Sequence, residues 1–151
     1  DYFWGAALKI KMKEDKQVEI GIKGRQTVTV DGTNTARVMG SGTLDVFATP
    51  SMVALMEETA WKSVEGELEE GSGTVGISLE VTHDAPTPVG MSVTCESELV
   101  EIDGRKLSFK IKAYDEKGEI GTAYHKRFII NEEKFLEKAE GKKRYHSFDR
   151  R

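Results

Sequence analysis

A single long stretch with helical periodicity, residues 49–64, stands among segments that alternate as strands do. At about 100° per residue, its apolar side chains fall on one arc, made of Met52, Val53, Met56, Ala60 and Val64. Thr49 is the expected N-cap, and Pro50 is the expected first helical residue, where a missing N–H costs nothing. The chain therefore has one long helix with which to cover its strands.

Strand patterns occupy most of the remaining chain. They lie at residues 17–30 (one strand or a hairpin), 74–82, 90–102, 105–115 and 119–131. In the segment 74–82, the odd-numbered apolar side chains are expected on one face, and these are Val75, Ile77, Leu79 and Val81. The Asp103-Gly104 and Glu116-Lys117-Gly118 turns join the last three segments as antiparallel neighbours.

An antiparallel sheet with one apolar face needs one cover, and the long helix supplies it. The sequence thus predicts an α+β fold in which the sheet wraps around one central helix. We expect one domain over residues 1–151, with residues 1–16 and a loosely ordered tail, 141–151, at the periphery. Residues 35–45 are expected to form a loop, and residues 132–139 a short terminal helix.

Charge, cysteine content and hydropathy limit the class of protein. No apolar run approaches the roughly 20 residues of a membrane span, and the formal net charge of −4 argues against nucleic acid as the main partner. The single cysteine, Cys95, excludes an intrachain disulfide and fits a reducing compartment. It lies in an alternating strand pattern, which is typical of a buried structural thiol. We expect a cytoplasmic protein without membrane or nucleic-acid partners.

Glu57 lies on the wrong side of the helix for a carboxylate. It projects toward the apolar arc near Val53, Ala60 and Val64, whereas Glu58 and Lys62 lie on the opposite, solvated side. A buried, unpaired carboxylate is costly, so Glu57 requires a partner or a chemical task. It is either a salt-bridged or outward-bent residue at the edge of the arc, or an acid–base or nucleophilic group in a site.

His83 is the second candidate for chemistry. It continues the odd-numbered face of its strand, and the following Asp84-Ala85-Pro86-Thr87-Pro88 segment ends the strand because proline cannot donate to the ladder. Alone, such a histidine is more typical of a structural role than of a catalytic one. If its face packs on the helix, its imidazole emerges on the side of Glu57, and the Thr49 hydroxyl could reach the same point. Hydroxyl, carboxylate and imidazole are the parts of a hydrolytic site.

Three further residues are weaker candidates. Gly76 interrupts a regular strand, which indicates a bulge, a close packing contact or a ligand that approaches the backbone. His125 and Arg127 lie on one face of the last strand and are typical surface residues, although Arg127 could meet a phosphate or carboxylate. No His/Cys cluster has metal-ligand spacing, and we expect neither a metal nor a cofactor.

Several of these residues also carry a resemblance to a known family. The helix run Val46 to Glu57 and the run Val81-Thr82-His83-Asp84-Ala85-Pro86-Thr87-Pro88 resemble the fluoroacetyl-CoA thioesterase family, which has the hot-dog fold. The segments around Gly104-Arg105-Lys106-Leu107-Ser108, His125-Lys126-Arg127 and Glu133-Lys134-Phe135 resemble it as well, so that the likeness covers about residues 46–139.

The resemblance implies a thioester hydrolase, usually a dimer whose sheets join edge to edge. It implies catalytic roles for Thr49, Glu57 and His83, a Gly76 amide that holds the thioester carbonyl, and a site-region arginine at Arg127. Before Val46 the family's enzyme has a longer, aromatic- and proline-rich lid, where this chain has Arg37-Val38-Met39-Gly40-Ser41-Gly42. The resemblance therefore extends to thioester hydrolysis rather than to selection of the fluoroacetyl group.

Together these observations predict an acyl-CoA thioesterase that cleaves a short-chain acyl-CoA into free acid and CoA and forms a homodimer. Glu57 would act as nucleophile or general base, and either remains open. The alternative is a non-catalytic module that binds or senses acyl-CoA through Gly76 and Arg127; hot-dog dehydratases match less well.

Overall fold

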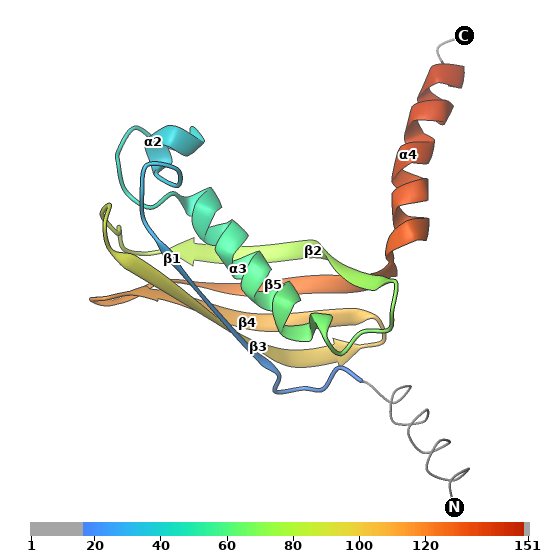
Figure 1. The fold of residues 1–151 in the computed structure, drawn as a ribbon, viewed down its shortest axis with the longest axis horizontal. Helices are drawn as coiled ribbons and strands as arrows, with labels where there is room; N and C mark the ends of the chain where they lie inside the picture. Colours follow the sequence, from blue (N-terminus) through green and yellow to red (C-terminus); the bar gives the residue numbers. More distant parts are fainter. Residues whose placement is uncertain (1–16, 150–151) are drawn as a thin grey trace, which may run out of the picture.

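The computed structural model describes residues 17–149, so the prediction for residues 1–16 lies outside the described part of the chain. Five antiparallel strands form one sheet in the order β1-β3-β4-β5-β2 (Figure 1). The strands are β1 (Lys23–Thr29), β2 (Ser72–His83), β3 (Ser92–Asp103), β4 (Lys106–Asp115) and β5 (Gly118–Asn131). The predicted α+β architecture is confirmed, and the first strand segment is a single strand rather than a hairpin.

The long helix α3 (Thr49–Glu65) lies diagonally across one face of this sheet (Figure 1). Met52, Met56, Ala60 and Val64 are fully buried, as the helical arc predicts, and Leu55 and Thr59 are buried beside them. From the sheet, alternate residues face the helix, and Leu107 and Phe109 of β4 are fully buried. Burial of each such large apolar side chain contributes about 1.5–3 kcal/mol.

A β-bulge in β2 changes which residues face the helix. The pairing with β5 shifts register between Gly76 and Ser78, so that Ile77 has no partner and is 50% exposed. Leu79 and Val81 pack against the core after the bulge, but Val75 pairs with Phe128, on the side opposite Gly76 and Arg127. The expectation that Val75 and Ile77 share the inner face is therefore wrong, because one extra residue reverses the alternation.

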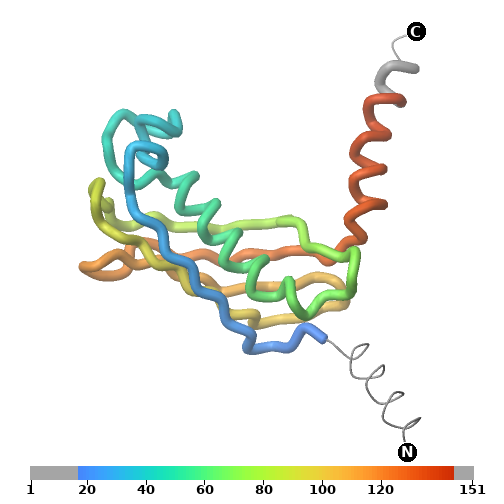
Figure 2. The backbone as a smooth tube through the Cα atoms, in the orientation of Figure 1, coloured from blue at the N-terminus to red at the C-terminus, as the bar shows by residue number. Residues whose placement is uncertain are grey.

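The segment between β1 and α3 is not entirely a loop. It contains the one-turn helix α2 (Ala36–Met39), which the Thr35 side chain caps. The segment is fastened beside the end of β2 by a bridge from Val46 to Pro88 and by a hydrogen bond from the Phe47 N–H to the Thr87 carbonyl, 2.8 Å. Figure 2 shows this segment and the turn after β2 at the same end of the molecule.

The terminal helix α4 (Glu132–Asp149) is longer than predicted and leaves the sheet at the end of β5 (Figure 1). Phe135 and Leu136 are 45% and 62% exposed, so their helical spacing does not bury them against the domain. The expectation of a loose tail from residue 141 is wrong as far as Asp149, because the backbone hydrogen bonds of the helix continue to that residue. Of the helices within residues 17–149, none combines the length and apolar content that a membrane span requires.

Candidate active site

Thr49 and His83 form the first half of the candidate site. The N-cap of α3 is Ala48, not Thr49, and no side chain caps this end of the helix. Thr49 is instead the first helical residue, and its Oγ1 lies 2.7 Å from Nδ1 of His83. The predicted cap is therefore wrong, because the histidine at the end of β2 competes successfully for the hydroxyl.

The other ring nitrogen of His83 is buried and unengaged. Nε2 has no hydrogen-bond partner among the described residues, which is costly for a buried polar atom unless it serves a ligand. Burial lowers the pKa of His83, and the nearby Asp84 carboxylate opposes this effect. The imidazole is thus neutral at pH 7, held at one nitrogen and available at the other.

A pocket of about 300 Å³ opens beside this histidine. Phe47 and Val46 line it from the segment before α3, and Ala85 and Pro86 line it from the turn after β2. Its polar lining comes from Thr49, His83, Ser41 and Asp84. The volume is at the small end of ligand pockets, and a mostly apolar wall with few polar groups is typical of them.

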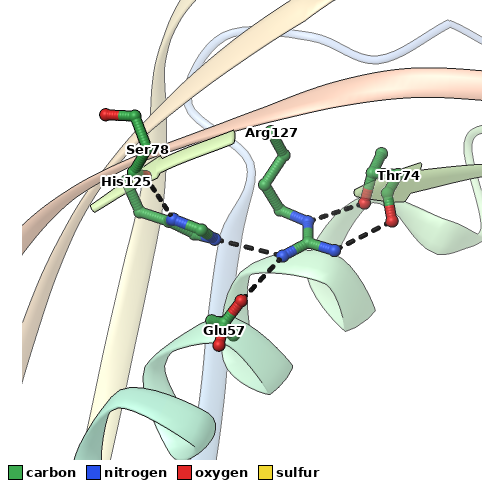
Figure 3. Close-up of polar contacts among 5 residues, drawn as sticks. All are labelled: Glu57, Thr74, Ser78, His125 and Arg127. Atoms are coloured by element: carbon green, nitrogen blue, oxygen red, sulfur yellow. Dashed lines mark hydrogen bonds and ion pairs between the residues drawn. The ribbon is translucent and has the colours of Figure 1, made fainter. Parts of the chain in front are cut away.

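Glu57 forms the second half of the candidate site, eight residues further along α3. Its Oε2 lies 3.7 Å from Nη1 of Arg127, and its side chain is 43% exposed (Figure 3). The salt bridge at the edge of the arc confirms the first interpretation of Glu57, and the acid–base or nucleophilic role stays a prediction. An accessible carboxylate held beside a guanidinium is placed to act as a base or nucleophile.

Arg127 and His125 are buried, and the prediction that they are surface residues is wrong. Arg127 is 6% exposed and donates to Oγ1 and the carbonyl of Thr74, each at 2.8 Å. His125 is 1% exposed and contacts the same guanidinium (Figure 3). Because the donors of Arg127 are engaged within the protein, its position does not support the predicted substrate contact. The sequence signal for their burial is the alternation along β5, because both residues lie on the same face as the buried Gly121 and Ala123.

Gly76 lies where the backbone of β2 meets this cluster. A Cβ at this position would lie 3.0 Å from Oε2 of Glu57, 3.3 Å from Cε1 of His125 and 3.4 Å from Nη1 of Arg127. The residue itself is exposed. Gly76 therefore permits close approach to the carboxylate, as the interrupted strand pattern suggests.

The structure brings the predicted residues together as two separate groups. Thr49 contacts His83, and Glu57 contacts Arg127 beside Gly76, but among residues 17–149 no hydrogen bond or ion pair joins Glu57 to His83. Eight helical residues correspond to about 12 Å of rise, which separates the two groups along α3. A single chain therefore does not bring the hydroxyl, carboxylate and imidazole to one point, and their convergence stays a prediction for a subunit pair.

Two other features lie outside both groups. A larger hollow of about 960 Å³ follows the outer face of the sheet, and charged side chains of both signs line it, among them Lys110, Lys112, Glu80 and Glu98. Cys95 is fully buried, as predicted, and burial raises the pKa of its thiol to about 11. A thiol in that state is a poor nucleophile.

Comparison with known proteins assigns the chain to a family. The sequence profile of the fluoroacetyl-CoA-specific thioesterase family matches residues 30–133, which is more than half of the chain. The fluoroacetyl-CoA thioesterase of Streptantibioticus cattleyicolor is 43% identical over 98 residues, which cover 65% of this chain and 70% of that protein. The chain therefore belongs to the fluoroacetyl-CoA-specific thioesterase family, and the class of protein is a thioester hydrolase.

Solved structures agree with this assignment. A fluoroacetyl-CoA thioesterase is 35% identical with a TM-score of 0.79, and the match covers 83% of this chain and 97% of that one. An F36A variant of the fluoroacetyl-CoA-specific thioesterase, in complex with fluoroacetate and CoA, is 35% identical over 78% of this chain and 99% of its own, with a TM-score of 0.74. A hot-dog-like protein from Thermanaerovibrio acidaminovorans is 22% identical and has a TM-score of 0.75, with 82% of this chain and 91% of that chain covered. The fold is thus the hot-dog fold.

Proposed function

We propose that the protein hydrolyses short-chain acyl-CoA thioesters to a free acid and CoA. The observation that carries the proposal is His83, which is bound at Nδ1 by Thr49 and keeps a buried, unpartnered Nε2 at the pocket. An imidazole in that state can pass a proton to a leaving thiolate. The pocket volume of about 300 Å³ supports a short acyl group, and the CoA-bound relative supports CoA as the carrier.

The proposed reaction divides the work between the two groups. Glu57 removes a proton from the water that attacks the thioester carbonyl, or its carboxylate attacks the carbonyl carbon and water then cleaves the resulting anhydride. The Gly76 N–H stabilises the oxyanion. When the C–S bond breaks, the N–H of His83 delivers a proton to the sulfur, CoA leaves as a thiol, and the proton released by the attacking water returns to the imidazole. Thr49 fixes the His83 ring, and Arg127 holds Glu57 rather than substrate.

A homodimer would unite the two groups. β2 is an edge strand of 12 residues, and a long open edge readily pairs with another chain. If two copies pair antiparallel through β2 around a two-fold axis midway between Gly76 and His83, Gly76 and Glu57 of one chain lie beside the partner's His83. Each dimer would then contain two sites, each built from both chains. We also propose that the protein acts in the cytoplasm.

Release of free thiol tests the function directly. The purified protein is incubated with a panel of acyl-CoAs, from acetyl-CoA to long-chain esters, and with fluoroacetyl-CoA, and the CoA thiol is followed with a thiol reagent. We expect turnover that is highest for short acyl groups, without a marked preference for fluoroacetyl-CoA. Binding of these esters without thiol release would contradict the proposal and support the non-catalytic module.

A further inference from the structure

His125 and Arg127 leave β5 on the same side and meet at their tips. The Nη1 of Arg127 lies 3.1 Å from Nε2 of His125, while Nδ1 of His125 lies 2.9 Å from the Ser78 carbonyl oxygen (Figure 3). A guanidinium only donates and a carbonyl only accepts, so Nε2 must be the acceptor and Nδ1 must carry the proton. The two contacts fix a single neutral tautomer of His125.

These two side chains also bracket the bulge in β2. Arg127 donates to Oγ1 and the carbonyl of Thr74 before the bulge, and His125 donates to the carbonyl of Ser78 after it. The register shift falls between these contacts, at Gly76 and Ile77. Bulges re-aim the backbone and occur next to active sites. Side chains of β5 thus hold the β2 backbone on both sides of the bulge.

Glu57 and the Gly76 backbone are held by the same network. The Glu57 carboxylate is paired with the guanidinium that His125 accepts from, and a Cβ on Gly76 would contact all three side chains at 3.0–3.4 Å. A displacement of the His125 ring would therefore move the carboxylate and the amide relative to each other. A misplacement of about 1 Å can cost about 100-fold in rate.

We infer that neutral His125 is a positioning residue for the proposed reaction: through Arg127 and the Ser78 carbonyl it sets the Glu57 carboxylate against the Gly76 amide. The inference rests on the proposed function and adds to it a requirement for one tautomer. It also predicts an acid limit, because protonation would place an N–H where Nε2 now accepts from a guanidinium.

The surroundings of His125 favour the neutral ring. Arg127 faces it from β5, Glu57 from α3, the Ser78 carbonyl from β2, and the Phe109 ring from β4, with ring centroids 6.3 Å apart. Burial is the largest effect and lowers the pKa of His125; the Ser78 carbonyl and Glu57 raise it, and Arg127 lowers it. The ring is thus neutral at pH 7 and becomes protonated only in acid.

Two substitutions separate the two contacts of the ring. In His125→Asn the amide nitrogen can still donate to the Ser78 carbonyl, but the side chain is too short to accept from Arg127. In His125→Gln the longer side chain can accept from Arg127. We expect His125→Asn to lower kcat about 10- to 100-fold with KM little changed, and His125→Gln to lose about threefold or less. The matched control is Lys126→Gln, on the opposite face of β5, with kcat unchanged.

The pH profile distinguishes positioning from mere support of the fold. Wild-type kcat should fall in acid as His125 is protonated, whereas His125→Gln should keep its kcat to lower pH. Wild-type kinetics in His125→Asn, or superimposable pH profiles of wild type and His125→Gln, would overturn the inference. If His125→Asn does not fold, the His125→Gln profile decides alone.

A spectroscopic test does not depend on turnover. Imidazole ¹⁵N chemical shifts of the labelled protein at pH 7.5 should show His125 neutral with its proton on Nδ1. An Nε2-protonated ring or an imidazolium would overturn the inference even in an active enzyme. Conversely, the Nδ1 tautomer without thiol release would contradict the proposed function and leave the local geometry intact, so the two failures are distinguishable.

Discussion

The two ends of helix α3 hold their polar groups in opposite ways. At its start, Thr49 and His83 form a single hydrogen bond of 2.7 Å and leave Nε2 buried without a partner among the described residues. Further along, Glu57 belongs to a network in which Arg127 and His125 are almost fully buried and engaged. The Thr49–His83 group leaves one nitrogen free for a ligand. In the Glu57–Arg127–His125 network the guanidinium and the imidazole are engaged with each other, and only the carboxylate is accessible. Each lacks what the other supplies, which is why we propose that they are halves of one site.

Removal of the Glu57 charge should have the largest effect. We expect Glu57→Gln to lower kcat about 1,000-fold or more, because the amide can neither attack nor accept a proton from water. The fold should persist, since the side chain is 43% exposed. Steady-state thiol release and thermal unfolding measure the two effects. Glu58→Gln, which alters only an exposed pair with Lys62, is the matched control; wild-type turnover in Glu57→Gln would refute its role.

Loss of the Thr49 hydroxyl tests the other half. Thr49→Val keeps the shape of the side chain but removes the hydrogen bond to Nδ1, so His83 loses its orientation. We expect kcat to fall about 10- to 100-fold, while Thr49→Ser stays within about threefold. Stability should change little in both variants because Thr49 is exposed and caps no helix. Equal activity of the valine and serine variants would show that the contact is not used.

The sequence predicted the elements of this fold better than their contacts. The helix arc of Met52, Met56, Ala60 and Val64 and the alternation of β4 are properties of one segment at a time, and both are confirmed. The phase of β2 depends on its register with β5, which reverses at Ile77. No pattern within the strand shows that reversal, although Gly76 marks the place where it occurs.

The sequence identifies individual residues of the candidate site but not the contacts among them. Glu57 and His83 stood out because each breaks the expectation for its own element. The helix start could not show that Thr49 would prefer His83 to a capping role, because that choice depends on where β2 ends. The alternation along β5 indicates that His125 and Arg127 lie on its inner face. A charged residue on an inner face is uncommon, however, which favours the surface prediction.

Acid should lower the free energy of unfolding through the buried His125. The folded-state pKa of His125 is lowered, chiefly by burial, so below the ordinary value of 6.5 the unfolded chain binds a proton that the native state does not. Stability is therefore complete above about pH 6.5 and falls as the pH drops toward the folded-state pKa, by up to about 1.4 kcal/mol per pH unit. Denaturant unfolding from pH 7.5 to 5 should be less pH-dependent in His125→Gln; parallel curves would contradict this.

Substitution of the buried thiol should have the smallest effect on catalysis. Cys95 lies outside both halves, and its pKa of about 11 keeps it protonated. Cys95→Ala should retain kcat within about twofold, with a stability loss of about 1 kcal/mol for the small cavity. In the wild type, a thiol reagent should modify Cys95 only after denaturation. A large loss of kcat in Cys95→Ala would place a third group in the site.

Subunit mixing tests most directly whether the two halves form one site across a dimer. Inactive Glu57→Gln and His83→Ala proteins are unfolded together, refolded in equal amounts and assayed for thiol release. Random pairing makes half of the dimers mixed, and each mixed dimer has one intact site of two, so about one quarter of wild-type activity should return. Mixing His83→Ala with Thr49→Val, both in the same half, should restore none. Absence of recovery from the first mixture, in dimers shown to have exchanged, would contradict a shared site.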